Sequence, residues 1–149
     1  MKAKHYQPEG NHTITPYLII PDPVALIEFT KKVFGAEETM RMTCPQGTIV
    51  HAEVRIGDSP LEFATASEQW PAMPASLHVY VADADAAFQR ALAAGGTVIK
   101  DIADQFYGER SGSIRDSNGN AWHIATKTEE LTEAEMKQRA ADYMAKSGS

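Results

Sequence analysis

The sequence predicts an α+β protein made of two tandem modules, each with the order strand, helix, strand, strand, strand. Short runs of alternating apolar and polar residues, typical of half-buried strands, stand around each helix-like segment. The caps, stops and strand ends repeat at an offset of about 61 residues, which aligns Asp22 with Asp83 and Gly35 with Gly96. Between the repeats, Ser67–Ala75 carries two prolines and no periodicity. We therefore expect modules at 13–66 and 76–129, joined by a linker at 67–75.

The first module has clear helix signals. Asp22 is a candidate N-cap, Pro23 suits the first helical position, and Gly35 suits the stop. These signals predict a helix over Pro23–Phe34, with Leu26, Ile27, Val33 and Phe34 on its inner stripe. Strands are expected at Ile14–Ile20, Glu38–Thr43, Thr48–Ile56 and Pro60–Thr65, with turns at 45–47 and 57–59.

The second module repeats this order. A strand is expected at Ser76–Val81, followed by an alanine-rich helix that either Asp83 or Asp85 caps and that ends at Gly95-Gly96. A strand at Thr97–Ile102 and a final hairpin then follow. The hairpin pairs Ser113–Arg115 with Ala121–Ala125 through a turn at Asn118-Gly119, two residues that tolerate positive φ.

Residues 130–149 are expected to form a separate helical tail. Thr132 and Glu135 have the spacing of a capping box, and Met136, Ala140, Tyr143 and Met144 make an apolar stripe. This helix should pack on the body of the protein or on a partner subunit, and it carries no chemistry.

Bulk composition excludes several classes of protein. Hydrophobic residues make up 43% of the chain and charged residues 23%, as in soluble globular proteins. A net charge of −6 without a basic stripe argues against nucleic-acid binding. No apolar run approaches the ~20 residues of a membrane span, and the N-terminus lacks a signal core. The single cysteine, Cys44, suits a reducing compartment, so a cytoplasmic location is expected.

Strand parity separates an apolar face from a polar one. Leu18, Val54, Phe63, Ile114 and Trp122 fall on the face expected to meet the helices. The other parity collects polar groups, including three histidines and two glutamates, which are costly to bury without a purpose. These positions are Thr15, Tyr17, His51, Glu53, Arg55, Glu62, Ser76, His78, Tyr80 and His123.

Two βαβββ modules, a proline-bearing linker and a D-x-x-G hairpin before the last strand resemble the vicinal oxygen chelate superfamily of glyoxalases, bleomycin-resistance proteins and extradiol dioxygenases. The resemblance covers residues 13–129. The stretches HAEVRIGDS, DQFYGERSG, DSNGNAWHIAT and EELTEAEMKQRA look closer still to its PhnB-like subgroup. It implies a glyoxalase/bleomycin-resistance fold, in which each sheet curls into a half-cup. The cups would face each other within one chain or across a homodimer.

The resemblance also implies a metal position, with one ligand from the first and one from the last strand of each module. Those positions are Thr15, Glu62, Ser76 and His123. Glu62 and His123 are good ligand types, whereas hydroxyls seldom bind divalent metals. His78 could supply a third ligand, and His51 a fourth only if the cup is narrow. The expected metal set is Glu62, His123 and His78, for one ion of Zn, Fe, Mn or Ni. The set is incomplete at Thr15 and Ser76.

The expected function is binding of a small molecule in the polar cup. One possibility is a metal-dependent lyase, isomerase or dioxygenase with Glu62 as general base. The alternative is a metal-free binding protein for an antibiotic or metabolite, and a weaker third reading is a dimeric partner with a vestigial cup. The residues expected to bind the ligand are Tyr17, His51, Glu53, Ser76, His78, Tyr80, Tyr107 and Arg110.

Structural roles stay open for several of these residues. Glu62 and His123 could pair with each other or with Arg55, and His51 and His78 could be ordinary hydrogen-bonded strand residues. Glu109 and Arg110 could form only a surface charge pair. We expect Phe63 and Trp122 to be core residues, and Asp116 and Asn118 to shape the turn.

Overall fold

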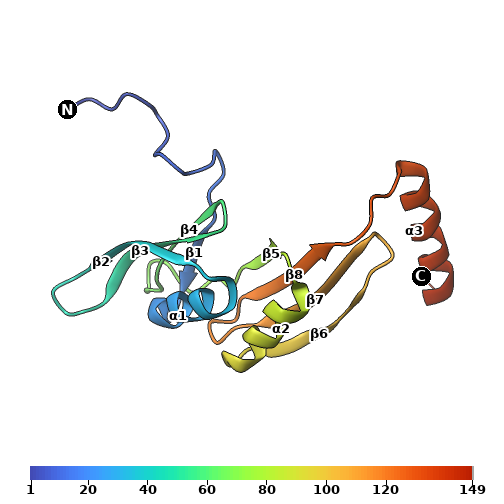
Figure 1. The fold of residues 1–149 in the computed structure, drawn as a ribbon. Helices are drawn as coiled ribbons and strands as arrows, with labels where there is room; N and C mark the ends of the chain where they lie inside the picture. Colours follow the sequence, from blue (N-terminus) through green and yellow to red (C-terminus); the bar gives the residue numbers. More distant parts are fainter. Residues whose placement is uncertain (149) are drawn as a thin grey trace. The chain divides into compact units, whose positions relative to one another are not determined.

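The computed structural model describes residues 1–148 and contains two four-stranded sheets (Figure 1). It divides into two compact units. The first unit comprises Met1–Ala75 together with Asp116–Asn120, and the second comprises Ser76–Arg115 together with the chain from Ala121 onward. Each unit carries one sheet and the helix that covers it, which confirms the predicted fold class of two tandem βαβββ modules.

In each sheet, one edge strand runs parallel to its neighbour, and all other neighbouring strands are antiparallel. The first sheet has the order β1-β4-β3-β2, with β1 parallel to β4, and the second has the order β5-β8-β7-β6, with β5 parallel to β8. The elements of the first unit are β1 Tyr17–Ile20, α1 Pro23–Phe34, β2 Glu37–Thr43, β3 Ile49–Ile56 and β4 Ser59–Thr65. Those of the second are β5 Ser76–Tyr80, α2 Ala84–Ala93, β6 Thr97–Asp104, β7 Glu109–Arg115, β8 Ala121–Lys127 and α3 Glu133–Ser147.

Helix α1 begins and ends where its sequence signals predict. The Asp22 carboxylate accepts a hydrogen bond from the Ala25 amide at 3.1 Å, and Gly35 closes the helix with a φ of 66°. The helix packs against β3 and β4. Its buried side is filled by Leu26, Ile27 and Val33, while the apolar face of the sheet contributes Leu18, Val54, Leu61 and Phe63. The polar face of this sheet is therefore the one turned away from α1.

The second unit is built in the same way around Trp122, Ile114 and Ile124, none of which has exposed surface. Asp83 is the N-cap of α2, since its carboxylate accepts from the Ala86 amide at 3.0 Å. Helix α2 lies close enough to β7 that a Cβ built on Gly112 would stand 2.7 Å from the Phe88 ring. Only glycine permits this approach.

The turn at Asp116–Asn120 belongs to the first unit and does more than reverse the chain. Asp116 accepts hydrogen bonds from the backbone amides of Asn118 and Asn120, as a turn-forming aspartate does. The Asn118 side chain accepts from the Asp22 amide and donates to the Asp22 carbonyl. Asn120 accepts from the Ala75 amide. The three side chains thus tie the turn to the N-cap of α1 and to the end of the linker.

Several strand boundaries differ from the sequence prediction. Strand β1 begins at Tyr17, three residues later than expected, because Pro16 offers no amide to a ladder; Ile14 is 85% exposed. Strand β7 begins at Glu109 instead of Ser113, since its backbone pairs with β8 from Glu109↔Lys127 onward. Strand β6 extends to Asp104 as an exposed edge strand.

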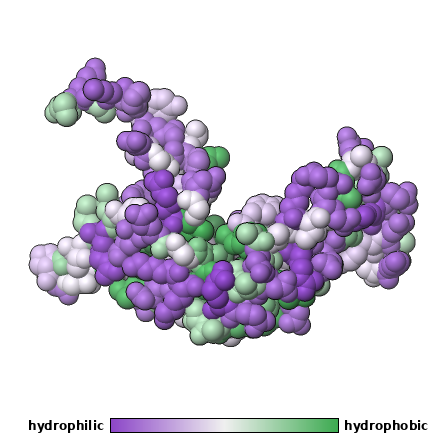
Figure 2. Space-filling model, viewed as in Figure 1, coloured by the Kyte–Doolittle hydropathy of each residue, from purple (hydrophilic) through white to green (hydrophobic). Residues whose placement is uncertain are grey.

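The tail helix α3 packs on its own unit through few contacts. The Arg139 guanidinium donates to the Phe106 carbonyl and to the Glu129 carboxylate, and Tyr143 stacks on Phe106 with ring centroids 4.8 Å apart. Thr132 is the N-cap, as predicted: its hydroxyl accepts from the Glu135 amide and donates to the Glu135 carboxylate. Figure 2 shows α3 and the N-terminal segment as mainly hydrophilic. Within residues 1–148, no helix has the length and apolarity needed to cross a membrane.

Candidate functional site on the first sheet

Strand register brings Tyr17, Glu62 and Glu53 into one row across the first sheet. Tyr17 on β1 pairs with Glu62 on β4, and Glu62 pairs with Glu53 on β3. Directly paired residues point to the same face, and His51 joins them because it lies two positions before Glu53. The residues that alternate with them are buried toward α1. We call these four residues, Tyr17, His51, Glu53 and Glu62, the first-sheet cluster.

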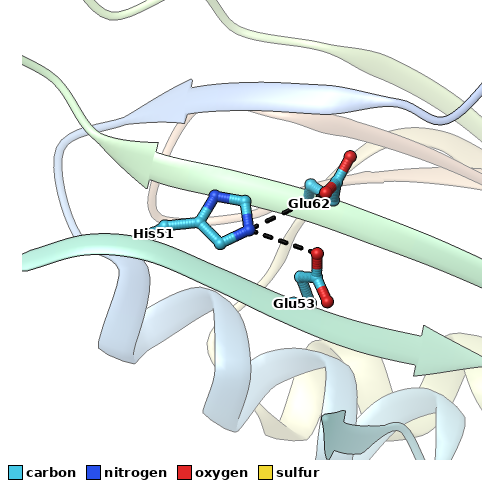
Figure 3. Close-up of side chains that lie close together, drawn as sticks. All are labelled: His51, Glu53 and Glu62. Carbon is cyan, nitrogen blue, oxygen red and sulfur yellow. Dashed lines mark hydrogen bonds and ion pairs between the residues drawn. The ribbon is translucent and has the colours of Figure 1, made fainter. Parts of the chain in front are cut away.

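The imidazole of His51 is the centre of this cluster (Figure 3). Its Nε2 atom lies 3.2 Å from Glu53 Oε1 and 3.7 Å from Glu62 Oε1. Its Nδ1 atom lies 3.2 Å from the Tyr17 hydroxyl. The side chains of His51, Glu53 and Glu62 retain about a fifth of their exposure, so solvent and small ligands can reach them.

The two carboxylates are close enough to perturb each other. Partial burial, and then the neighbouring Glu53, raise the pKa of Glu62, while hydrogen bonding to Glu62 and to His51 lowers the pKa of Glu53. Partial burial and both glutamates also raise the pKa of Tyr17. Like charges side by side favour retention of one proton or the binding of a cation. Neighbouring carboxyl groups whose pKa values are shifted in opposite directions are typical of functional sites.

Replacing Glu62 with glutamine should stabilise the protein near pH 7. A pKa that is raised in the folded state stabilises the protein at pH values below 4.5, the ordinary pKa of glutamate. This stabilisation is lost as the pH rises through the pKa of the folded state. The neutral amide escapes this loss and can still donate to Glu53. We expect E62Q to exceed the wild type by about 0.5–1 kcal/mol at pH 7 and to match it near pH 4, in urea unfolding followed by circular dichroism. E68Q, in the exposed linker, is the control and should change nothing. A destabilised E62Q at pH 7 would contradict this electrostatic account.

An open hollow of about 780 Å³ begins beside the cluster. Tyr17 belongs to both, since it lines the hollow and contacts His51. Trp70 and Met73 form part of its wall and are 62% and 68% exposed. The complete lining is Tyr17, Ile19, Thr48, Ile49, Val50, Ala64, Thr65, Ala66, Ser67, Trp70 and Met73. Sequence reasoning missed Trp70 and Met73 because it treated their segment only as a linker; a tryptophan directly before the first of two prolines, and a methionine between them, were the available signals.

The second unit carries its own polar cluster, centred on His123. Its Nε2 lies 2.8 Å from the Ser76 hydroxyl and its Nδ1 lies 2.7 Å from the Ser113 hydroxyl, so both ring nitrogens are hydrogen-bonded. His78, the cross-strand partner of His123, stacks on Tyr80 and lies 3.6 Å from Glu109 Oε1. Ser113 was missed from the sequence, although its alternation with the buried Ile114 places it on this face.

Two other predicted ligand residues are engaged in local contacts of the second unit. Arg110 donates to both carboxylate oxygens of Asp85, at 2.7 and 2.9 Å, and also to Asp104. It therefore does not pair with Glu109, whose partners are Tyr80 and His78. Tyr107 packs edge-on against Phe106, with ring centroids 5.1 Å apart, in the short turn between β6 and β7.

The register also bears on the metal positions that the resemblance implies. Thr15 lies outside the sheet and donates to the His12 carbonyl, and the residue beside Glu62 on the first strand is Tyr17. The residue beside His123 is His78, and Ser76 pairs with Ala121. The set Glu62, His78 and His123 draws on both units and stays a prediction. Within the first unit alone, ligand atoms of His51, Glu53 and Glu62 lie within 4.8 Å of one another.

Comparison with known proteins identifies the family. The model of the Glyoxalase/Bleomycin resistance protein/Dioxygenase superfamily matches residues 10–124. The chain belongs to this superfamily. A Mycobacterium bovis relative, Mb0911c, is 32% identical over 135 residues, which cover 83% of the chain and 89% of that protein. Rv0887c of Mycobacterium tuberculosis is 32% identical over the same share of the chain and 79% of its own length. Both are described as uncharacterized, so they add no activity.

Three solved structures share the fold. TioX from Micromonospora sp. ML1 is 24% identical with a TM-score of 0.64, and the match covers 81% of this chain and all of TioX. The PhnB protein of Bacillus cereus is 16% identical with a TM-score of 0.60, over 77% of this chain and 99% of PhnB. PA1353 from Pseudomonas aeruginosa is 21% identical with a TM-score of 0.65, over 80% of this chain and all of PA1353. At these identities the likeness concerns the fold alone.

Proposed function

We propose that this superfamily member binds a small organic molecule on its first unit. The observation that carries the proposal is the position of Tyr17, which joins the first-sheet cluster to the open hollow. An apolar body in the hollow would contact Trp70 and Met73, while the polar end of the molecule would meet His51, Glu53 and Glu62. Concave apolar surface with a few convergent polar groups is the usual composition of a ligand site.

Charge determines which polar ends the cluster accepts. Two carboxylates at 3.2 and 3.7 Å from one imidazole accept hydrogen bonds from amines and hydroxyls, and they repel anionic groups. The apolar end gains by leaving water, at roughly 25 cal/mol per Å² of buried apolar surface. A ligand without an apolar body would lose this second contribution.

Thermal-shift measurements on matched aromatic compounds test the proposal. We would use benzylamine, benzyl alcohol and benzoate, and larger fused-ring analogues of each, with a chelator present. Amines and alcohols should raise the melting temperature and carboxylates should not. W70A and E62Q should each weaken the response about tenfold, which corresponds to 1.4 kcal/mol. Y6A and E68Q are the controls and should respond as the wild type does. No response to any compound, or equal responses in W70A and Y6A, would overturn the proposal.

A second candidate function is catalysis with Glu62 as a general acid or base. The raised pKa of Glu62 favours it, because a carboxylate with a pKa above its ordinary value is a stronger base, and proton transfer is most efficient when the catalytic pKa lies nearer the working pH. The test uses an aromatic ketone with a C–H next to its carbonyl group, incubated in D₂O and followed by NMR, because the amines, alcohols and carboxylates of the thermal-shift set have no carbon-bound proton that a carboxylate can remove. Deuterium incorporation or turnover by the wild type that disappears in E62Q would support catalysis. A spectrum unchanged by the wild type would leave binding as the whole activity for that compound.

We also propose that the protein acts as a cytoplasmic homodimer. Met40 and Met42 are exposed on the edge strand β2 and give the first unit apolar surface, away from the hollow lining, that a second copy could cover. Light scattering at micromolar concentration should then give twice the 16.3 kDa of one chain. A monomer mass would refute this proposal without affecting the ligand site.

A further inference from the structure

We infer that His51, Glu53 and Glu62 form a divalent metal site within the first unit alone. Of these three, only Glu62 belongs to the first-and-last-strand positions that the family resemblance implies; His51 and Glu53 lie on β3. The inference deepens the proposed function, since the ion would stand between the chain and the polar end of the bound molecule. It names oxygen donors as the chemical class of that polar end.

The distances suit one ion. Ligands that each lie about 2.1 Å from a metal can be at most about 4.2 Å apart. His51 Nε2 is 3.2 Å from Glu53 Oε1 and 3.7 Å from Glu62 Oε1, and the three atoms lie within 4.8 Å of one another. Small side-chain rotations therefore suffice to bring all three atoms to one ion. The backbone register Glu53↔Glu62 already fixes the positions from which the two carboxylates reach.

Tyr17 completes the arrangement from the other side of the imidazole. Its hydroxyl lies 3.2 Å from His51 Nδ1 and can accept the Nδ1–H hydrogen. In that tautomer the Nε2 lone pair is available to the ion, which would take the place of the Nε2–H that bonds Glu53 in the metal-free protein. Metal-binding histidines almost always have their second nitrogen held by such a partner, which fixes both tautomer and ring orientation. The ring of Tyr17 also lies 5.6 Å from the imidazole centroid and restricts its rotation.

The donor types select among metals. One imidazole and two carboxylates favour Zn²⁺, Fe²⁺ or Mn²⁺ over Mg²⁺ and Ca²⁺, which prefer oxygen alone. Three protein ligands leave positions open for water or for oxygen atoms of a small molecule. The ion would neutralise both carboxylates, so the site would accept anionic oxygen ligands that the metal-free cluster repels.

Calorimetric titration with Zn²⁺ and Mn²⁺, and the visible spectrum with Co²⁺, test the site after metal is removed by dialysis against chelator. The variants H51N, E53Q and E62Q remove one ligand each, and H78N and H123N are matched controls in the second unit. The wild type should bind one equivalent. Each ligand variant should lose more than about 100-fold in affinity, and Y17F should lose about 10- to 100-fold. The controls should bind as the wild type does. Circular dichroism establishes that each variant is folded.

Three outcomes overturn the inference: no binding by the wild type, undiminished binding by both H51N and E53Q, or a loss in H78N or H123N as large as in H51N.

Benzoate and benzylamine thermal shifts, measured with and without Zn²⁺, separate this inference from the proposed function. Zn²⁺ should make benzoate a stabiliser in the wild type and not in H51N. Benzylamine that binds without metal, with no effect of Zn²⁺ on benzoate, would refute the metal site and leave ligand binding intact.

Discussion

Replacing Trp122 with alanine is expected to cost about 3–5 kcal/mol of folding free energy, because a large side chain with no exposed surface leaves a cavity. Trp122 is paired with Leu77 and Ile114 on the neighbouring strands, in the core beneath α2. Domains of this size have only about 5–15 kcal/mol of stability, so W122A should be close to unfolded at 37 °C. Urea unfolding followed by circular dichroism measures the loss.

Trp70 provides the matched control, since it is the other tryptophan of the chain and is 62% exposed. W70A should change stability by less than about 0.5 kcal/mol while weakening ligand binding. W122F keeps an aromatic ring and should lose less than W122A. Equal stability losses in W70A and W122A would show that burial of Trp122 is not what stabilises the second sheet.

Asn120→Ala is expected to cost about 2–3 kcal/mol, although the side chain is small. Asn120 is fully buried, donates to Asp116 at 3.0 Å and accepts from the Ala75 amide at 2.9 Å. Truncation leaves the Ala75 amide without this side-chain partner and removes one donor from Asp116, and buried polar groups that lose partners are destabilising. The loss is measured by the same urea titration.

Two further variants separate hydrogen bonding from packing at this turn. N120D keeps the shape and the acceptor for Ala75 but sets a carboxylate against Asp116, so it should lose at least as much as N120A at pH 7. S117A, at the exposed neighbouring position, should be neutral. An N120D variant as stable as the wild type at pH 7 would contradict the hydrogen-bond account.

Local sequence signals predicted the elements where caps and stops were explicit. Both ends of α1 were predicted correctly, because Asp22, Pro23 and Gly35 are typical of an N-cap, a first helical position and a helix stop. Strand β7 was cut short because Glu109–Gly112 has no apolar alternation, and only its pairing with β8 makes it a strand. Strand β1 was extended too far because Ile14 looks like a strand residue until Pro16 is taken into account.

The sequence predicted which side chains share the polar face of the first sheet, but not which of them are in contact. Strand alternation placed Tyr17, His51, Glu53 and Glu62 on the polar face. Which of them touch depends on the register between strands, and that is set by backbone pairing that no local pattern encodes. The pairing Tyr17↔Glu62 therefore came only from the structure, as did the contact of Tyr17 with His51. The repeat offset gave no help, because it related the modules to each other and not the strands within one module.

The two sheets have diverged on their polar faces. At the repeat positions 17 and 62, the first sheet carries a phenol and a carboxylate, and the second carries two imidazoles, His78 and His123. The hydroxyls of Ser76 and Ser113 occupy both nitrogens of His123, whereas Nε2 of His51 faces two carboxylates. This difference is why the first unit is the better candidate for a cation and for the molecule it would hold.

Paramagnetic broadening by Mn²⁺ tests the central claim most directly, because it locates a bound ion without knowledge of the ligand. Substoichiometric Mn²⁺ is added to ¹⁵N-labelled protein, and the loss of each amide signal is followed by NMR. The account predicts that signals of residues 17, 51–53 and 61–63 broaden first, and that H51N abolishes the effect. Broadening centred on β5 and β8, or on the acidic residues 129–135, would contradict it.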